Sequence, residues 1–381
     1  MSPPSDVETR AVARDALVRI DTGEAYANLV LPAMLERSHL DERDRRFVTE
    51  LVYGTTRMRR AVDAELAPHV HRDVEPAVQA ALRLGVYQLH FAGVAAHAAV
   101  HTAVRCAPKR AQGFVNAVLR RVSEAGPTEH TNRAITLSYP DWIVQRLRSD
   151  LGDADAYGAL EAMNQPPRPH VREDGYVQDP ASGWVAGLVG AMPGHRVADV
   201  CAAPGGKATA LAHVVADDGL VVAADKRPGR VELINENAER TATAEFLAPI
   251  IADALRPPLR PAAFDRVLID APCTGMGVLH RRPDARWRIH VDDVDRLAAQ
   301  SQRLLEAAAP LVAHDGLLVF SVCTINAAET ADVAGWAVAH LKGFTPMPAP
   351  GGPWHAHGHG ALLLPQAAGT DGMFIARLHR S

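Results

Sequence analysis

From about residue 184 onward, short apolar runs alternate with segments of helical spacing, and this alternation restricts the possible folds more than any other feature of the chain. The strand candidates are HRVADV, LVVAAD, FLAPIIAD, FDRVLIDA and DGLLVFSV. The segments between them include GKATALAHVV, GRVELINENAERT and the long amphipathic VDRLAAQSQRLLEAAAPLVAH. Strands that alternate with helices build a mostly parallel sheet with crossover helices. We therefore predict a Rossmann-like α/β domain with a closing strand at FIARLHR.

Residues 1 to about 125 have a different pattern, in which apolar residues recur four positions apart. Phe47 with Leu51 and Val78 with Leu82 show this helical spacing. We predict about six short helices packed as a bundle, with Asp41 capping one of them. The expected breaks are the prolines Pro32, Pro68, Pro76 and Pro108. The predicted fold class is thus α + α/β, an all-helical bundle followed by the α/β domain.

Two stretches between these halves are rich in turn-forming residues. GPTEHTN, at 126–132, is typical of a linker, and NQPPRPHVREDGYVQDPASG has too many turn residues to hold much regular structure. We predict a helical domain over residues 1–126, a connecting region over 127–183 and the α/β domain over 184–381.

The net charge of −4 does not favour a nucleic-acid partner, but the charges are unevenly distributed. Between Glu75 and Glu124 there is no acidic residue, while six Arg and Lys side chains occur from Arg83 to Arg121. HRRPDARWR is a second basic cluster. Both could bind RNA phosphates, although a solvated helical face explains the first equally well. The residues predicted to contact RNA are Arg105, Lys109, Arg110, Arg120, Arg121, Arg281, Arg282 and Arg286.

Several classes of protein are disfavoured. No apolar run is long enough to span a membrane and MSPPSDVETRAVARD is too polar for a secretory signal, so we expect a cytoplasmic protein without a membrane partner. The four cysteines are widely spaced and form no C-x-x-C, which favours free thiols over a zinc cage or disulfides. WHAHGHG could chelate a metal, but we favour a polar loop and predict no metal site.

The predicted strands deliver informative residues at their C-terminal ends, where open α/β sheets bind ligands. DVCAAPGGKAT matches neither G-x-x-x-x-G-K-[ST] nor G-x-G-x-x-G, but its glycines let backbone N–H groups approach a ligand closely. Asp225, Asp253 and Asp270 end the next three strands. One such acid alone would more often be a cap or turn residue, whereas the succession favours a pocket for ribose and base. A nucleotide-type pocket without phosphate-binding groups indicates S-adenosylmethionine.

Cys273, in IDAPCTGMG, and Cys323, in LLVFSVCT, each follow a strand-like run beside this pocket. A thiolate is a strong nucleophile, and an enzyme that must add to an unreactive ring can use one. The pair therefore suggests covalent chemistry on a pyrimidine base. Cys106 and Cys201 are interpreted as structural residues.

Three segments, DVCAAPGGKAT, IDAPCTGMGVLHRRPDARW and VFSVCT, resemble the most specific motifs of the RNA (cytosine-5) methyltransferases. The chain is similar to the bacterial 16S ribosomal RNA methyltransferase B type of that family, also called Sun or Fmu, because LVYGTTRMRRAVD and GFVNAVLRRV resemble its NusB-like RNA-binding domain. The resemblance covers nearly the whole chain. It implies a NusB-like bundle, a class I methyltransferase domain, S-adenosylmethionine as cofactor, and methylation of C5 of a cytosine in RNA, expected to be 16S ribosomal RNA.

The resemblance also implies roles for individual residues. Cys323 would be the nucleophile that adds to C6, Cys273 would assist release of the thiol, and Asp270 would stabilise charge on the ring. The base must be splayed out of any stack to be attacked. The residues implied to bind the cofactor are Cys201, Ala202, Ala203, Pro204, Gly205, Gly206, Lys207, Asp225, Asp253 and Asp270.

The chain departs from the family pattern in two places. Val322 replaces the usual Thr before the nucleophile, and only HVREDGY stands between Pro169 and the V-Q-D segment that contains Gln178, where relatives have a small ferredoxin-like subdomain. The shortened stretch leaves two alternatives open. One is an RNA-binding scaffold whose methyltransferase half is degenerate or weak, and the other is the same chemistry on tRNA. In each case we expect a monomer.

Overall fold

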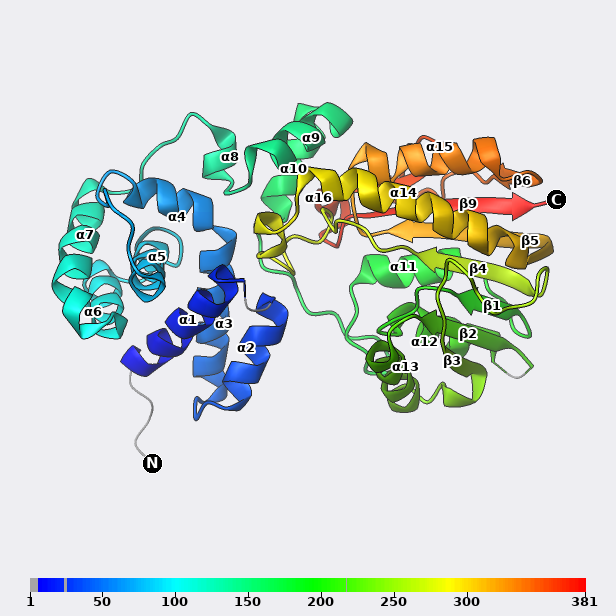
Figure 1. Ribbon diagram of the computed structural model, residues 1–381, viewed down its shortest axis with the longest axis horizontal. Helices are drawn as coiled ribbons and strands as arrows, with labels where there is room; N and C mark the ends of the chain where they lie inside the picture. The colour runs from blue at the N-terminus through cyan, green and yellow to red at the C-terminus, as the bar shows by residue number, and fades with distance from the viewer. Residues whose placement is uncertain (1–5, 24–25, 217) are drawn as a thin grey trace. The chain divides into compact units, whose positions relative to one another are not determined.

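The computed structural model describes residues 6–23, 26–216 and 218–381, and the chain divides into two compact units (Figure 1). The first unit runs to Gln145 and also contains Leu279–Arg288, while the second comprises Arg146–Val278 and Ile289–Ser381. The domain borders expected at residues 126 and 183 stay predictions. Among the described residues, no helix is long and apolar enough to cross a membrane.

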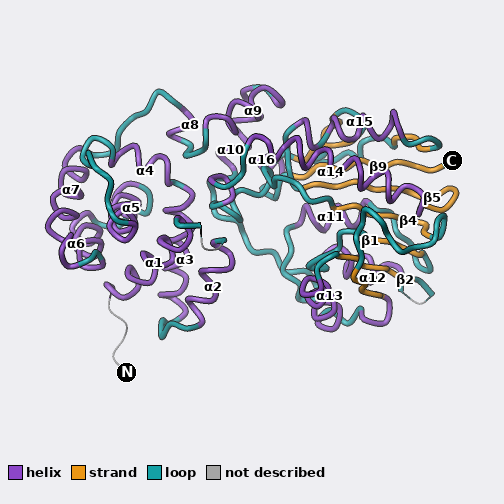
Figure 2. Tube along the Cα trace, in the orientation of Figure 1, coloured by secondary structure: helices purple, strands orange, loops and turns teal. Residues whose placement is uncertain are grey.

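The described part of the first unit contains helices and no strand; the strands, orange in Figure 2, all belong to the second unit. Its core is formed by buried apolar side chains such as Leu17, Leu51 and Leu84. Its elements are α1 (Asp6–Asp21), α2 (Ala27–Glu36), α3 (Glu42–Arg57), α4 (Arg59–Leu66), α5 (Pro76–His90), α6 (Ala96–Cys106), η1 (Lys109–Ala111), α7 (Gln112–Ala125), α8 (Arg133–Thr136), η3 (Ala285–Trp287) and α9 (Asp141–Leu151), which continues into the second unit.

The predicted helical bundle is confirmed, and its ends follow local chemistry. Asp41 caps α3, because its carboxylate accepts a hydrogen bond from the Asp44 N–H at 2.8 Å. Pro76 occupies the start of α5, where the N–H that proline lacks would have no partner in any case. The expected break at Pro32 is wrong, since this proline lies inside α2. Burial of the neighbouring Leu31 offsets the one helical hydrogen bond that is lost.

The segment Leu279–Arg288 is distant in sequence from the rest of the first unit but packs among its helices. The Trp287 indole N–H donates to the Thr56 carbonyl at 2.7 Å. The Asp284 carboxylate accepts from the Ala27 N–H at 3.1 Å. The first unit is therefore completed by residues that the sequence patterns assigned to the α/β half.

Nine strands of the described residues form one sheet in the second unit, in the order β3-β2-β1-β4-β5-β9-β8-β7, with β6 beside β9. β1 to β5 pair in parallel and β9 is antiparallel to β5. The predicted α/β fold with a closing C-terminal strand is confirmed. The strands are β1 (Arg196–Asp199), β2 (Leu220–Asp225), β3 (Leu247–Ile251), β4 (Phe264–Asp270), β5 (Val312–Val322), β6 (Phe344–Pro346), β7 (His355–His357), β8 (Gly360–Leu363) and β9 (Met373–Arg380).

The strand order reverses between β1 and β4, so right-handed crossovers place α12 and α13 on one face of the sheet and α14 on the other (Figure 1). Ligands bind at such a switch point, outside the carboxyl ends of the strands. The remaining elements are α10 (Asp153–Ala162), α11 (Pro180–Leu188), α12 (Gly206–Val215), α13 (Pro228–Arg240), η2 (Ala244–Phe246), α14 (Val291–Ala308), η4 (Ala309–Leu311), η5 (Ala327–Glu329), α15 (Ala331–His340) and α16 (Pro365–Ala368).

Candidate active site

The loop Cys201–Lys207 joins β1 to α12 at the switch point. Gly205 adopts a φ of +109°, a conformation that residues with a Cβ rarely adopt. A Cβ on Gly206 would lie 3.0 Å from the Tyr176 ring, so a larger residue would push against that side chain. Because Gly205 and Gly206 have no side chains, they do not cover the N-terminal end of α12. The first N–H groups of the helix can therefore face a polar or anionic ligand group.

Two of the predicted cofactor acids lie at the ends of neighbouring strands. Asp225 ends β2 and pairs with Arg230 of α13, with 3.2 Å between its Oδ2 and the Arg230 Nε. The register places Asp225 opposite Ile251, two residues before the exposed Asp253. These carboxylates offer acceptors of the kind that ribose hydroxyls and an exocyclic amine require.

Asp199, at the end of β1, is a buried acid that the sequence analysis did not single out. It is 1% exposed, and its Oδ1 accepts from the Cys201 N–H at 3.3 Å. Burial, followed by the charge of Asp270, raises the pKa of Asp199 to about 7. The sequence could have identified Asp199 as a candidate site residue by its position at a strand end, directly before the glycine loop. Asp199 thus adds a third acid to the surroundings of that loop.

Lys207 and Asp270 form an ion pair, with 2.7 Å between Nζ and Oδ2. Burial alone would lower the pKa of Lys207, but the neighbouring Asp270 carboxylate more than offsets this effect and the pKa is raised. Lys207 therefore stays protonated at neutral pH. The pair connects the first turn of α12 to the end of β4 and places a charged ammonium near Cys323.

The structure brings Cys273 and Cys323 together, with 3.4 Å between the two Sγ atoms. Cys273 follows β4 and Cys323 follows β5, and these strands are parallel neighbours. The hydrogen bond shared with Cys323, followed by burial, raises the pKa of Cys273. Val322 is fully buried in β5, so the family's usual hydroxyl is replaced by an apolar contact within the sheet. Two free thiols at this separation can act on one bound molecule.

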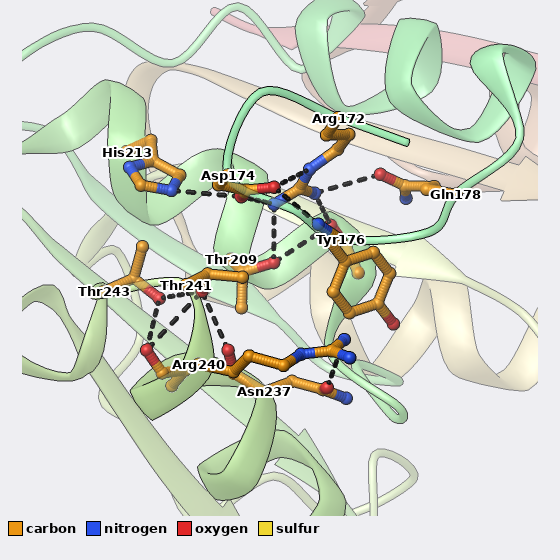
Figure 3. Close-up of polar contacts among 12 residues, drawn as sticks. Arg172, Asp174, Tyr176, Gln178, Thr209, His213, Asn237, Arg240, Thr241 and Thr243 are labelled. Carbon is orange, nitrogen blue, oxygen red and sulfur yellow. Dashed lines mark hydrogen bonds and ion pairs between the residues drawn. The ribbon is translucent and has the colours of Figure 1, made fainter. Parts of the chain in front are cut away.

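The shortened stretch 169–178 forms a small hairpin against α12 (Figure 3). Arg172 pairs with Asp174 inside the hairpin and donates to the Gly206 carbonyl at 2.6 Å and to the Thr209 hydroxyl at 3.1 Å. His213, one turn further along α12, contacts Asp174 with 3.1 Å between Nε2 and Oδ2. The hairpin thus binds the first two turns of the helix that follows the glycine loop.

The Tyr176 side chain of this hairpin lies between two guanidinium groups (Figure 3). The Arg172 and Arg240 Cζ atoms lie 4.9 and 5.1 Å from its ring centroid. Such cation–π contacts hold an aromatic ring in place. Because the ring occupies the space that a Cβ on Gly206 would need, the hairpin and α13 together border the outer side of the glycine loop.

The predicted RNA-binding residues all belong to the first unit. Arg105, Lys109, Arg110, Arg120 and Arg121 are exposed on α6, η1 and α7, although Arg110 pairs with Glu75 at 2.5 Å. Arg83, which the charge count included, is instead buried between Asp63 and Asp21. In the other cluster Arg282 is exposed and Arg281 is half-buried.

The prediction that Arg286 contacts RNA is corrected by the structure. Arg286 is fully buried, its Cζ lies 3.8 Å from the Tyr139 ring centroid, and it donates to the carbonyls of Arg57 and Ser138. A guanidinium enclosed in this way offers no donor to a phosphate. Sequence reasoning failed here because basic side chains were counted without knowing which ones the fold encloses.

Cys106 and Cys201 have raised pKa values, and two of the histidines near the C-terminal end lie in a strand. Burial raises the pKa of Cys106 to about 11 and also raises the pKa of Cys201, so both thiols stay protonated. His355 and His357 belong to β7. Within the described ranges no three His, Cys, Asp or Glu side chains are grouped as metal ligands.

Solved structures share this architecture. The crystal structure of PH0851 matches the whole of both chains with a TM-score of 0.81 at 21% identity. A methyltransferase homologue from Pyrococcus horikoshii matches 66% of this chain and 98% of its own with a TM-score of 0.56 at 22% identity. At these identities the likeness shows the fold alone.

Family models and relatives carry the comparison further. Residues 188–379 match the 16S rRNA methyltransferase RsmB/F family, and residues 7–124 match the NusB family. Ribosomal RNA small subunit methyltransferase B of Thermus thermophilus is 35% identical over 97% of both chains. A putative methyltransferase of Mycobacterium tuberculosis is 33% identical over 99% of this chain and 97% of its own. The chain belongs to the RsmB/F family of S-adenosylmethionine-dependent rRNA methyltransferases, with a NusB domain at its N-terminal end.

Proposed function

We propose that this protein transfers a methyl group from S-adenosylmethionine to C5 of a cytosine in RNA, through a covalent bond between Cys323 and C6 of the base. The observation that carries the proposal is the separation of 3.4 Å between the Cys273 and Cys323 Sγ atoms, beside the Lys207–Asp270 ion pair. Two thiols at that distance can act in turn on one base, and the Lys207 ammonium lies near Cys323.

In the proposed reaction the Cys323 thiolate bonds to C6, and the electrons of the C5=C6 double bond move to C5. When bound, S-adenosylmethionine supplies a methyl group on a positively charged sulfur for C5 to take. Loss of the C5 proton then restores the double bond and expels the Cys323 thiolate, a release that Cys273 assists. Asp270, held by Lys207, would accept a hydrogen bond from the amino group or from a protonated N3 of the cytosine. This contact would stabilise the charge distribution that develops on the ring as the thiolate adds.

The residues of the pocket fit this cofactor. The N–H groups of the loop Cys201–Lys207 would hold its carboxylate, and Asp225 would hold the ribose. Asp253 lies at the next strand end, where it would accept from the adenine amine. The charges of Asp270 and Asp225 both raise the pKa of Asp199, so negative charge is concentrated here. That concentration suits a ligand with a positive sulfur and a positive amino group.

For the substrate we propose 16S ribosomal RNA, bound in part by the NusB domain. Relatives covering almost the whole chain carry the name ribosomal RNA small subunit methyltransferase B. The exposed cationic side chains of α6, η1 and α7 supply a basic surface without an acidic residue between Glu75 and Glu124. We further propose that the protein acts as a monomer, which light scattering of the free protein would test.

The cysteine roles are tested by separate replacements in the full chain. Cys323→Ala should abolish methylation, with a loss of at least about a thousandfold, because the nucleophile is removed. Cys273→Ala should add to the base but release it slowly, and protein bound covalently to RNA should appear on denaturing gels. Bisulfite sequencing of cellular RNA with and without the protein identifies the modified cytosine.

Cys106→Ala, at a buried thiol of the first unit, is the matched control and should keep the wild-type rate. Methylation of cytosine by Cys323→Ala at the normal rate would rule out the proposed mechanism. If a tRNA cytosine loses its protection without the protein while every 16S site stays protected, the same chemistry is assigned to tRNA instead.

A second function is favoured by the shortened stretch 169–178, which stands in place of a larger subdomain. In that case the chain is an RNA-binding scaffold whose methyltransferase half is weak. Calorimetry with S-adenosylmethionine separates the two functions. Micromolar binding supports the enzyme, whereas absence of binding by a folded, RNA-binding chain supports the scaffold.

A further inference from the structure

A buried carboxyl group lies beneath the two cysteine loops. Glu329, at the end of η5, is 1% exposed. Its Oε1 accepts from the Thr274 N–H at 2.8 Å, and its Oε2 accepts from the Thr274 hydroxyl at 2.5 Å. The Asn326 amide at 2.5 Å and the Thr324 hydroxyl at 3.3 Å donate to the same oxygen. Burial raises the pKa of Glu329, and these donors oppose that rise.

The donors come from both loops that carry the thiols. Thr274 directly follows Cys273, and Thr324 directly follows Cys323. The two threonine hydroxyls also lie 3.1 Å apart. A single carboxyl group therefore joins the residue after one cysteine to the residue after the other.

The backbone contacts between the same loops do not replace this link. Ala271 donates its N–H to the Ser321 carbonyl at 2.9 Å, and Gly277 donates to the Cys323 carbonyl at 3.0 Å. One of these backbone hydrogen bonds precedes Cys273 in the chain and the other follows it. The position of Thr274, between them, therefore depends on contacts with side chains. The Thr274 N–H and hydroxyl are both directed to Glu329.

We propose that Glu329 is a positioning residue for the paired thiols, setting the separation and orientation of Cys273 and Cys323 through Thr274 and Thr324. The inference deepens the proposed function and rests on it for its catalytic consequence. A carboxylate is required because four donors converge on its two oxygens, and an amide would turn N–H groups toward them. Glu329 forms no described hydrogen bond to either thiol, but its charge also raises the pKa of Cys273, so loss of that charge alone would speed disulfide formation and not slow it.

The test measures thiol spacing directly, in the full chain and without RNA. Diamide takes two electrons and two protons from a thiol pair, forming a disulfide and the reduced hydrazine. Wild-type protein should form the Cys273–Cys323 disulfide readily, since the sulfurs need to close only from 3.4 Å to bonding distance. Glu329→Gln, which keeps the size of the side chain, should form it about tenfold more slowly, because a shift near 1 Å costs this much or more in oriented reactions.

The exposed Glu306 of α14 supplies the matched control, and Glu306→Gln should form the disulfide at the wild-type rate. If Glu329→Gln does not fold, Thr274→Val decides the question, because it removes one donor to the same carboxyl group and should slow the disulfide in the same direction. For methylation, the kcat of Glu329→Gln should fall about tenfold to a hundredfold while KM for RNA stays unchanged.

The outcomes separate the two proposals. The positioning role is overturned if folded Glu329→Gln forms the disulfide at the wild-type rate, whatever its melting temperature. If that variant does not fold, the same result for Thr274→Val overturns the role. If the wild-type protein does not methylate RNA, the proposed function is overturned. Slower disulfide formation by Glu329→Gln would in that case still support the role of Glu329 in setting the thiol spacing. A fall in kcat with unchanged thiol spacing assigns Glu329 a merely structural role.

Discussion

At the scale of single residues, the site is governed by how buried charges are partnered. Lys207 keeps its proton because Asp270 lies 2.7 Å away, whereas Asp199 has only the Cys201 N–H at 3.3 Å as a described hydrogen-bond donor. Burial of the Asp199 carboxyl, followed by the negative charge of Asp270, outweighs the opposing charge of Lys207 and raises the pKa of Asp199 to about 7.

The pKa of Asp199 makes a prediction about stability. Its ordinary value is 3.8, so between pH 4 and pH 7 the folded protein holds a proton that the unfolded chain has released. Raising the pH through this window therefore destabilises the second unit. Asp199→Asn should be more stable than wild type at pH 8, on the order of 2 kcal/mol, and the difference should vanish toward pH 4. Urea unfolding at several pH values measures it, and a difference independent of pH would contradict the assignment.

At the scale of elements, the hairpin 170–178 shows what a turn-rich segment becomes in the fold. The sequence indicated only that it holds little regular structure, and this is consistent with its single bridge between Val171 and Val177. The docking onto α12 was not predictable, because Arg172 reaches residues 34 and 37 positions away. A short segment can therefore brace α12 through side-chain contacts alone.

Removing the main contact of the hairpin should weaken cofactor binding. Arg172→Ala deletes the donors to the Gly206 carbonyl and Thr209, and a charged hydrogen bond is worth about 1.5–3 kcal/mol, so the Kd for S-adenosylmethionine should rise about tenfold. Asp174 has a pKa of about 2, lowered chiefly by its hydrogen bond to Arg172, so the effect should be the same at pH 5 and pH 8. Calorimetry measures the Kd.

The exposed Arg168 supplies the control for this experiment, and Arg168→Ala should bind the cofactor as wild type does. An Arg172→Ala protein with wild-type affinity would show that the hairpin does not support the glycine loop.

At the scale of the whole molecule, chain order and compact units do not coincide. Leu279–Arg288 belongs to the first unit although it follows β4 directly in the chain. Trp287 and Asp284 bond to helices of that unit, and Arg286 is enclosed there with Tyr139. The segment that follows β4 and contains Cys273 is thus divided between the units, and its later part, Leu279–Arg288, belongs to the first.

Replacing Arg286 should therefore affect stability and not RNA recognition. Burial lowers its pKa to about 10, so the guanidinium is still charged at neutral pH and its loss leaves buried carbonyls without donors. Arg286→Ala should destabilise the first unit by about 3 kcal/mol. Thermal unfolding measures this, with the exposed Arg282→Ala as the nearly neutral control. A variant of wild-type stability whose RNA binding depends less on salt would restore Arg286 as a phosphate contact.

The sequence by itself determined the helices and strands and their order along the chain. Spacing of apolar residues predicted the bundle and the parallel sheet, and strand-end positions placed Asp225, Asp270 and both thiols on one edge, because the carboxyl ends of parallel strands meet there. The motifs added the family, which the matches over residues 7–124 and 188–379 confirm. These features depend on local periodicity and on residue type, which a sequence displays.

Only the tertiary structure decided which polar groups are enclosed and what they touch. It enclosed Arg286, left Arg282 exposed, placed Asp199 under the glycine loop and directed Thr274 and Thr324 to Glu329. Each of these outcomes depends on contacts between residues far apart in the chain, or on burial that such contacts create. Residue type fixes the charge and the donors that a side chain carries, whereas its surroundings set its pKa and its partners.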